Sequence, residues 1–351
     1  MGADPARWAR RLGISREAVE LYAASEVVDA HVESFVWTRL IGYDLGHRHG
    51  AGLLGGCFYS QADLPRMVEA GLGAAVLSVA TNPLRRRSSR TATLLRNLAR
   101  LQAAVERQGD TATVVTDIAG YRRARAAGRL AVFVGLQGGN ALGFPGDVDR
   151  LPPGLVSRVT LVHLTASSVG SPSAPSTRPG RGLTGEGREL VQALNGARIL
   201  VDLAHIGVRG FWDALAVHDR TQPAIVSHTG VRAVHDLWRN VDDDQIRAIA
   251  DLGGVVGIMF HAGFLGEPFW AGRAEAVVAH IDHVINVAGE DAVAIGSDFD
   301  GLIVPPADLR TVSGLPVLAQ HMLDRGFSAE RVGKVLGANY LGVMSRIRPG
   351  D

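Results

Sequence analysis

Two residue types with distinctive chemistry are nearly missing from this sequence of 351 residues. The single cysteine, Cys57, excludes an intramolecular disulfide and any metal site built from several cysteines. The single lysine, Lys334, leaves almost all of the positive charge to arginine. Because 36 Lys+Arg residues face 35 Asp+Glu residues, the formal charge is +1 and gives no reason to expect nucleic acid or an anionic membrane as a partner.

Long apolar runs are missing as well. No segment reaches the roughly 18 apolar residues that a membrane span needs, and the first residues contain no apolar signal segment. Ala6 stands where a myristoylation signal has Ser or Thr. We therefore expect a cytoplasmic protein with no membrane partner. The chain is nevertheless 46% hydrophobic, which is enough for a large buried core.

Short apolar runs alternate with amphipathic stretches from one end of the chain to the other. Runs of four to six residues that are apolar on both faces are typical of parallel strands covered on both sides. We interpret the following ranges as such strands: 27–30, 74–79, 130–134, 159–162, 199–203, 224–226, 255–258 and 292–295. Eight strand-helix units indicate an α/β protein with a (β/α)8 TIM barrel. An open doubly wound sheet is the competing fold, but no Gly-rich first turn supports it.

Helical patterns lie between these runs, at 91–108, 186–195 and 273–287, and a last helix begins at Ser328. Residues 171–182 are rich in Pro, Ser and Gly, which predicts a surface loop that could serve as a lid. We divide the chain into a short N-terminal helical extension, residues 1–26, and a single barrel domain, residues 27–351.

Polar residues follow the predicted strands at the points where the strands end. These residues are His31, Glu33, Gln137, His163, His205, His228 and Asp298. Because the carboxyl ends of barrel strands converge on one mouth, side chains scattered over the whole chain can lie close together there. Imidazole and carboxylate groups are the ligands that zinc and similar metals prefer.

Each of these residues could instead have a purely structural role. A single histidine at a strand end is more often a hydrogen-bonded structural residue than a metal ligand. Four histidines at the same topological position make coincidence a poor explanation. Asp29 and Asp202 lie inside strand runs, where they could orient histidines or serve as paired structural acids.

Several motifs together carry a resemblance to a known family. They are DAHVE, DLPRMVEAGLGA, GLQGGNAL, TLVHLT, GLTGEGRELVQALN, VDLAH, PAIVSHTGVRAV, RNVDDD, HIDHVINVAG, AIGSDFDG and VLGANYLGVM. The sequence resembles the membrane dipeptidases (renal dipeptidase, peptidase family M19), a branch of the amidohydrolase-like metal-dependent TIM barrels. The similarity runs from about residue 27 to about residue 344.

The resemblance implies a set of metal ligands. The family's first His-x-Asp, which binds one zinc, falls on His31 and Glu33. The glutamate that bridges two zinc ions falls on Gln137, and the histidines of the second zinc fall on His205 and His228.

The resemblance also implies three residues that act on substrate. The histidine that polarises the scissile carbonyl falls on His163, and the arginine that binds the substrate carboxylate falls on Arg239. The catalytic aspartate beside the nucleophilic water falls on Asp298.

Two positions depart from the family pattern. Glu33 in place of Asp moves the carboxylate outward by one methylene, about 1.5 Å. Gln137 in place of Glu removes a negative charge and offers a poor bridge between two mutually repelling cations. We therefore expect one Zn²⁺ rather than two, with an empty site as the remaining alternative.

The leading hypothesis is a metal-dependent, dipeptidase-like hydrolase that cleaves a dipeptide or small amide with a free carboxylate. One alternative is a barrel of the same ancestry that does specialised or non-hydrolytic chemistry on a peptide-like substrate. Another is a metal-free binding protein that keeps the carboxylate pocket. A homodimer is left open.

Overall fold

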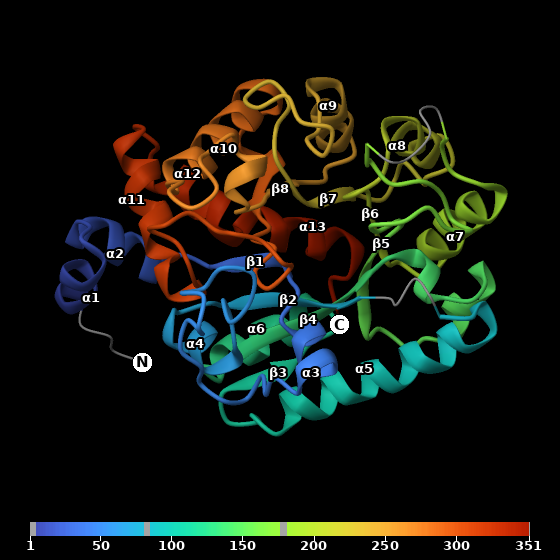
Figure 1. Ribbon diagram of the computed structural model, residues 1–351, viewed down its shortest axis with the longest axis horizontal. Helices are drawn as coiled ribbons and strands as arrows, with labels where there is room; N and C mark the ends of the chain where they lie inside the picture. Colours follow the sequence, from blue (N-terminus) through green and yellow to red (C-terminus); the bar gives the residue numbers. More distant parts are fainter. Residues whose placement is uncertain (1–4, 81–84, 176–180, 351) are drawn as a thin grey trace.

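The strands form one parallel sheet that curls into a barrel, as Figure 1 shows for the computed structural model, which describes residues 5–80, 85–175 and 181–350. The strand order is β1-β2-β4-β5-β6-β7-β8-β9, and β3 pairs with β4 outside this path. The strands are β1 (Val28–Val32), β2 (Ala74–Ala80), β3 (Ala112–Val114), β4 (Leu130–Gln137), β5 (Val156–Thr160), β6 (Leu200–Asp202), β7 (Ala224–Thr229), β8 (Val256–Ile258) and β9 (Val293–Ile295). The expected α/β barrel with N-terminal helices is confirmed.

The ring closes just beyond the strands β9 and β1. Val32 forms a parallel bridge with Phe299, and the Glu33 N–H donates to the Phe299 carbonyl at 2.8 Å. Five of the eight predicted ranges agree with the strands to within two residues at each end. Strand β5 begins three residues before the predicted range of 159–162, and β4 and β7 each end three residues beyond the predicted ranges of 130–134 and 224–226. The additional strand β3 was not predicted, since three residues are too few to show a period.

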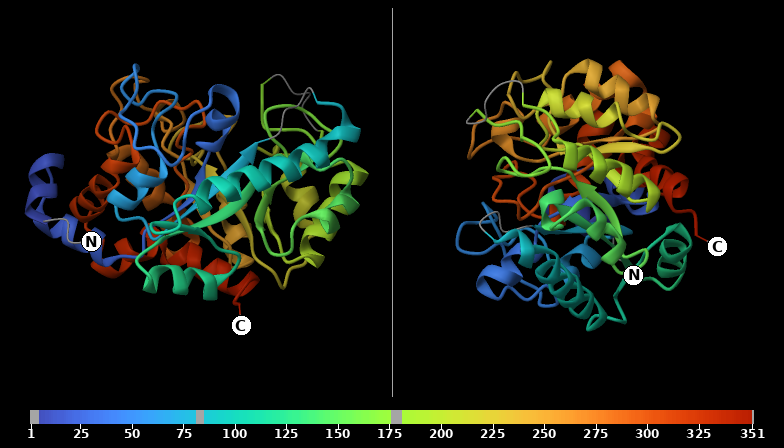
Figure 2. Two further views of the ribbon diagram at one scale, coloured as in Figure 1. Left: turned by 90° about the horizontal axis from the view of Figure 1, so that it is seen from below. Right: turned by 90° about the vertical axis from the view of Figure 1, so that its right-hand side faces the viewer.

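Helices surround the barrel (Figure 2), and α-helices connect the successive strands except β4 and β5, between which there are only two short 3₁₀ helices, Gly139–Ala141 and Pro145–Arg150. The α-helices are α1 (Pro5–Leu12), α2 (Arg16–Ala24), α3 (Phe35–Ile41), α4 (Leu64–Glu69), α5 (Arg90–Glu106), α6 (Ile118–Ala126), α7 (Gly185–Gly196), α8 (Val208–Leu215), α9 (Asp243–Asp251), α10 (Glu275–Ala288), α11 (Pro316–Asp324), α12 (Ala329–Gly333) and α13 (Asn339–Ile347). Ser328 caps α12 as predicted, since its hydroxyl accepts the Arg331 N–H at 3.2 Å.

The N-terminal extension consists of α1 and α2, and α2 packs beside α11 at the edge of the barrel (Figure 1). The boundary between this extension and the barrel domain stays a prediction. Within the described ranges, no helix is long and apolar enough to cross a membrane. Part of the predicted loop at 171–182, namely residues 176–180, lies outside the described residues.

The barrel has two apolar cores. The outer core lies between the strands and the surrounding helices. The inner core fills the amino-terminal half of the barrel, mostly with small and medium side chains such as Val28 and Ala74, together with the larger Phe133. Tyr340 and Met344 of α13 pack against the same cluster, so this helix plugs the bottom of the barrel. Function is therefore confined to the opposite mouth, as in other TIM barrels.

A polar layer lies above the inner core. Arg158 of β5 and Asp202 of β6 are fully buried there and form an ion pair of 2.9 Å. Gly135 of β4 makes room for this guanidinium, because a Cβ at this position would lie 2.9 Å from Arg158 Cζ. The layer separates the apolar plug from the mouth.

Breaking the buried ion pair is expected to destabilise the fold. Asp202→Ala leaves the Arg158 charge buried without its carboxylate, and such a change costs about 3–5 kcal/mol of unfolding free energy. Urea unfolding followed by circular dichroism measures it. The control is Glu20→Ala, which breaks an exposed ion pair with Arg16 and should cost less than about 1 kcal/mol. Equal losses in the two variants would contradict a structural role for the buried pair.

Candidate metal centre and active site

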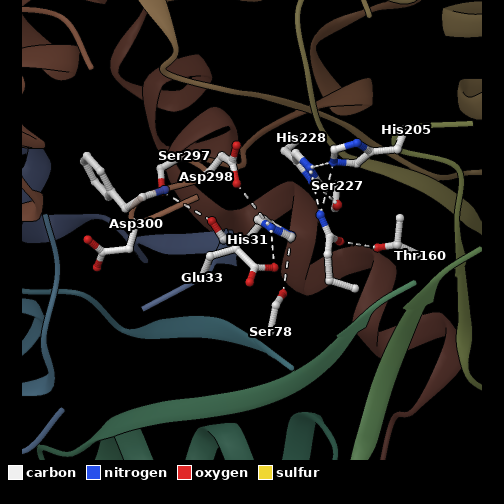
Figure 3. A network of polar contacts seen from close by, with 12 residues as sticks. His31, Glu33, Ser78, Thr160, His205, Ser227, His228, Ser297, Asp298 and Asp300 are labelled. Atoms are coloured by element: carbon white, nitrogen blue, oxygen red, sulfur yellow. Dashed lines mark hydrogen bonds and ion pairs between the residues drawn. The ribbon is translucent and has the colours of Figure 1, made fainter. Parts of the chain in front are cut away.

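The candidate site lies where β1, β7 and the segment after β9 meet at the barrel mouth (Figure 3). Its strands are irregular there, since the pairing register shifts between Asp29 and Val32 on β1 and between Val226 and Thr229 on β7. Such bulges redirect side chains and are common beside active sites. They give His31 and His228 their places in the mouth.

Backbone strain is concentrated at the same mouth. His205, Asp298 and Asp300 all have positive φ angles, of 64°, 61° and 68°. These angles are unfavourable for residues other than glycine, and they persist where the surrounding structure enforces them. Asp298 is held by its own N–H, which donates to the His31 carbonyl at 3.0 Å.

His31 is fully buried and contacts charged groups through both ring nitrogens. Its Nε2 lies 3.2 Å from Glu33 Oε1 and 3.4 Å from Asp298 Oδ1 (Figure 3). Its Nδ1 faces the Arg158 guanidinium and lies 3.4 Å from the Ser78 hydroxyl. Because arginine N–H groups only donate, Nδ1 accepts from Arg158 and the ring proton lies on Nε2, which faces the two carboxylates; a metal ion bound at Nε2 would replace that proton.

His228 is oriented by a hydrogen-bond chain from Asp202. The Ser227 hydroxyl donates to Asp202 Oδ2 at 2.6 Å and lies 2.8 Å from His228 Nδ1. Because that hydroxyl proton is used, His228 Nδ1 donates to Ser227, and Nε2 carries the lone pair, which faces His205 Nε2. A carboxylate acting on a ligand histidine in this way is typical of metal sites.

Gln137 and His205 complete the polar wall beside His228. His205 Nε2 lies 2.8 Å from His228 Nε2, and the Gln137 side-chain amide is 3.1 Å from His205 Nε2. The Thr160 hydroxyl contacts both Gln137 Oε1, at 2.9 Å, and Asp202 Oδ2, at 2.5 Å, although it has one proton to donate. Turning the Gln137 amide group satisfies Thr160 and aims Oε1 at the two histidines.

Burial shifts the protonation of the site. It lowers the pKa values of His31, His205 and His228 well below the usual value, so these rings are neutral. Burial raises the pKa of Glu33 to about 7. Burial, followed by the charge of Glu33, raises the pKa of Asp298 well above its usual range.

These residues fit a metal ion. His31, His228 and Asp298 each offer one ligand atom, and the three atoms lie within 4.8 Å of one another. Within the described part of the chain, the buried His31 Nε2 and Glu33 Oε1 have no hydrogen-bond partner of acceptable geometry. Neutral imidazoles and carboxylates with unsatisfied lone pairs are the donor set that zinc prefers. Sequence reasoning had placed Asp298 beside the nucleophilic water, whereas the geometry includes it among the candidate ligands.

A cavity of about 410 Å³ opens directly onto this cluster. Glu33, Gln137, His205 and Asp298 line its floor, and Arg239 lines its wall. The Arg239 Nη2 donates to the His228 carbonyl at 2.9 Å, whereas its buried Nε has no partner among the described residues. Burial lowers the pKa of Arg239 to about 10, so it remains a cation at neutral pH.

His163 also lines the cavity and packs edge-on against His205, with ring centroids 4.8 Å apart. Burial, followed by the charge of Arg239, lowers the pKa of His163 to about 4. All of the residues that the sequence singled out as candidates therefore gather at this mouth. Of the two acids left open, Asp202 orients His228, whereas Asp29 accepts the backbone N–H groups of His31 and Ser297.

Sequence reasoning missed three residues at this site. Arg158 and Asp300 are fully buried, and Asp300 accepts the N–H groups of Gln61 and Ala62, which holds the loop before α4. Burial raises the pKa of Asp300 to about 6. His261 lines the cavity three residues after β8. The position of His261 after a predicted strand was an available signal.

Comparison with known families identifies the family to which this chain belongs. The family model for membrane dipeptidases (Peptidase family M19) matches residues 15–349, nearly the whole chain. The chain belongs to peptidase family M19. It is therefore a member of a metallopeptidase family built on the amidohydrolase-type barrel, as the sequence motifs indicated.

Individual M19 relatives show how far the likeness extends. An uncharacterized protein in the pqqA 5′ region of Klebsiella pneumoniae is 37% identical over 182 residues, 50% of this chain and 64% of that protein. Dipeptidase tcpJ of Claviceps purpurea is 33% identical over 223 residues, 63% of this chain and 52% of tcpJ. The matches thus span less than two thirds of the length of either relative.

A solved metallopeptidase structure matches over nearly its whole length. It is a metallopeptidase from Rhodobacter sphaeroides, liganded with a phosphinate mimic of the dipeptide L-Ala-D-Ala. The two chains are 26% identical and superpose with a TM-score of 0.79, over 92% of this chain and 99% of that one. A dipeptide-like ligand is therefore bound by a relative with the same fold.

Removing one candidate ligand should abolish metal binding. His228→Ala is expected to lower zinc affinity by more than about 10- to 100-fold, the loss typical of residues that only orient a ligand. Elemental analysis of zinc-loaded, desalted protein measures the content per chain. The matched control is His283→Ala on α10, which removes a histidine that pairs with Asp243. Metal loss in both variants, or in neither, would contradict the assignment.

Proposed function

We propose that this protein is a metal-dependent dipeptidase-like hydrolase that cleaves a dipeptide or small amide carrying a free carboxylate. The observation that supports it most strongly is the cluster of His31, His228 and Asp298, of which Asp298 lines a cavity that Arg239 also lines. Family membership supports the same chemistry, and the dipeptide mimic bound by the Rhodobacter sphaeroides protein supports the size of the substrate.

Arg239 binds the substrate carboxylate in this proposal. Its side chain is buried, positively charged and lacks a partner for Nε within the described residues. A buried guanidinium with a free N–H favours a carboxylate strongly, because the ion pair forms away from water. The carboxylate contact fixes one end of the substrate and orients the amide bond toward the floor of the cavity.

His163 and Asp298 act on the amide bond. His163 is neutral and presents an N–H donor, so it stabilises the negative charge that develops on the carbonyl oxygen. The Asp298 carboxylate accepts the proton of the attacking water and returns it to the leaving amine. Both side chains line the same cavity as Arg239, which is the arrangement that the reaction needs.

The residues favour one metal ion over two. A subset of His31, Glu33, His205, His228 and Asp298 would hold it, and Gln137 offers a neutral carbonyl oxygen rather than a bridging carboxylate. A bound zinc ion would supply Lewis acidity and lower the pKa of a bound water. The neutral amide group of Gln137 also supports a second candidate, a barrel specialised for different chemistry on a peptide-like substrate.

Peptide hydrolysis tests the proposal. Zinc-loaded protein should release free amino acids from a panel of dipeptides, and Asp298→Asn should lower kcat by about 10²–10⁴-fold because the proton acceptor is lost. Amino-acid release is measured by chromatography, with metal content determined in parallel. Asp282→Asn, which changes an acid of α10 paired with Arg325, should keep wild-type activity. No turnover of any dipeptide by metal-loaded wild-type protein would overturn the proposal.

Restoring the family's carboxylate tests the metal number. Gln137→Glu is expected to raise the zinc content from about one to about two per chain, because a carboxylate offsets the repulsion between two cations. Elemental analysis after zinc loading measures this change. Gln320→Glu on α11 adds the same charge away from the mouth and should leave the content unchanged. Two zinc ions in the wild-type protein would show that Gln137 does not limit the site.

A further inference from the structure

Six rings form a continuous row from the cavity outward, and we call this row the aromatic strip. Its members, in spatial order, are Trp238, Phe264, His261, Phe269, Trp270 and Phe58. Successive ring centroids lie 6.1, 4.7, 5.6, 4.8 and 5.9 Å apart. These spacings fall in the range of direct aromatic contact.

The aromatic strip joins the cavity to the surface. Trp238, Phe264 and His261 line the cavity, whereas the other three rings continue beyond it. Phe58 is anchored to the cavity wall, since its N–H donates to the carbonyl of the lining residue Ile303 at 2.7 Å. The strip is therefore one surface with the candidate active site.

Burial does not explain the aromatic strip. Trp238, Phe269 and Trp270 are 44%, 40% and 59% exposed, in a chain that is only 6% aromatic. Leu164 and Leu302, which are also exposed, border the same cavity. A contiguous exposed apolar surface beside a polar site is typical of ligand binding.

The aromatic strip is also uncharged. His261 Nδ1 accepts the Gly263 N–H at 3.3 Å, which places its proton on Nε2. Burial lowers the pKa of His261 to about 4, so the ring is neutral at physiological pH. An anionic group would find no charged partner in the strip itself, and the Arg310 guanidinium, whose Nη2 donates to the Trp270 carbonyl at 2.5 Å, disfavours a cation over these rings. The strip favours an apolar group, with one N–H donor available from His261.

From this continuity we propose that the aromatic strip binds a bulky, uncharged apolar group of the substrate. The substrate is then a dipeptide-like amide with a large aromatic or aliphatic side chain, rather than a dipeptide of two small residues. This inference rests on the proposed function for the position of the amide bond. It adds a specificity surface that lies outside the candidate ligands and outside Arg239.

The test compares two phosphinate dipeptide analogues, which resist hydrolysis, on zinc-loaded protein. One mimics alanyl-alanine, and the other carries an indolylmethyl side chain in place of one methyl group, with each position tried in turn. Calorimetry is expected to show that one bulky analogue binds at least about tenfold more tightly, since apolar pockets discriminate at this level. The Trp238→Ala variant should lose that preference and keep its affinity for the small analogue within about twofold.

Trp212→Ala is the matched control, because Trp212 lies on α8, is 41% exposed and does not line the cavity. It should change neither affinity. Equal binding of the bulky and small analogues by the wild-type protein would overturn the inference and leave the proposed function standing. A preference for the bulky analogue without hydrolysis of the corresponding amides would overturn the proposed function only. Binding of neither analogue would overturn both.

Discussion

The buried ion pair between Arg158 and Asp202 is the interaction on which both halves of the site depend. The Arg158 guanidinium contacts His31 Nδ1 and the Ser78 hydroxyl, so it positions one candidate ligand. Asp202 binds the Ser227 hydroxyl and thereby orients the imidazole of His228, the other histidine of the cluster. Because an unpaired charge inside a barrel is costly, neither residue can move without the other. The ion pair between two neighbouring strands thus fixes the positions of two histidines that are far apart in sequence.

Most of the barrel could be predicted from sequence because its strands are apolar on both faces and evenly spaced. The gathering of the histidines could be predicted as well, since parallel strands bring their carboxyl ends to one mouth. The burial of Arg158 could not be predicted, because an arginine in VSRVT looks like a strand residue that points toward solvent. Its burial depends on the space that Gly135 leaves on the neighbouring strand, and a contact across strands has no signature in either segment alone.

Loop conformation accounts for the other gaps. The aromatic strip joins residues from three separate loops, and only the folded loops bring Phe58 beside Trp270 and Trp238 beside Phe264. Likewise, the left-handed backbone of Asp298 turns its carboxylate toward His31, at 3.4 Å. Sequence similarity assigned Asp298 one role, as the residue beside the water. Its distance from His31 also makes it a candidate metal ligand, so the proposed function gives Asp298 both roles.

Charge balance at the mouth connects the metal number to the substrate. Glu33 and Asp298 are the two carboxylates that face the cluster, and Arg158 is already neutralised by Asp202. When ionised, these two carboxylates balance one divalent ion, whereas a second ion would leave two buried positive charges uncompensated beside the guanidinium of Arg239. A glutamate at position 137 would reduce that excess, and the neutral Gln137 does not. In the proposed function, a substrate carboxylate then pairs with Arg239 rather than with a metal ion. The proposed apolar group of the substrate lies along the uncharged aromatic strip, so the two proposals assign a charged end and an apolar end to one cavity.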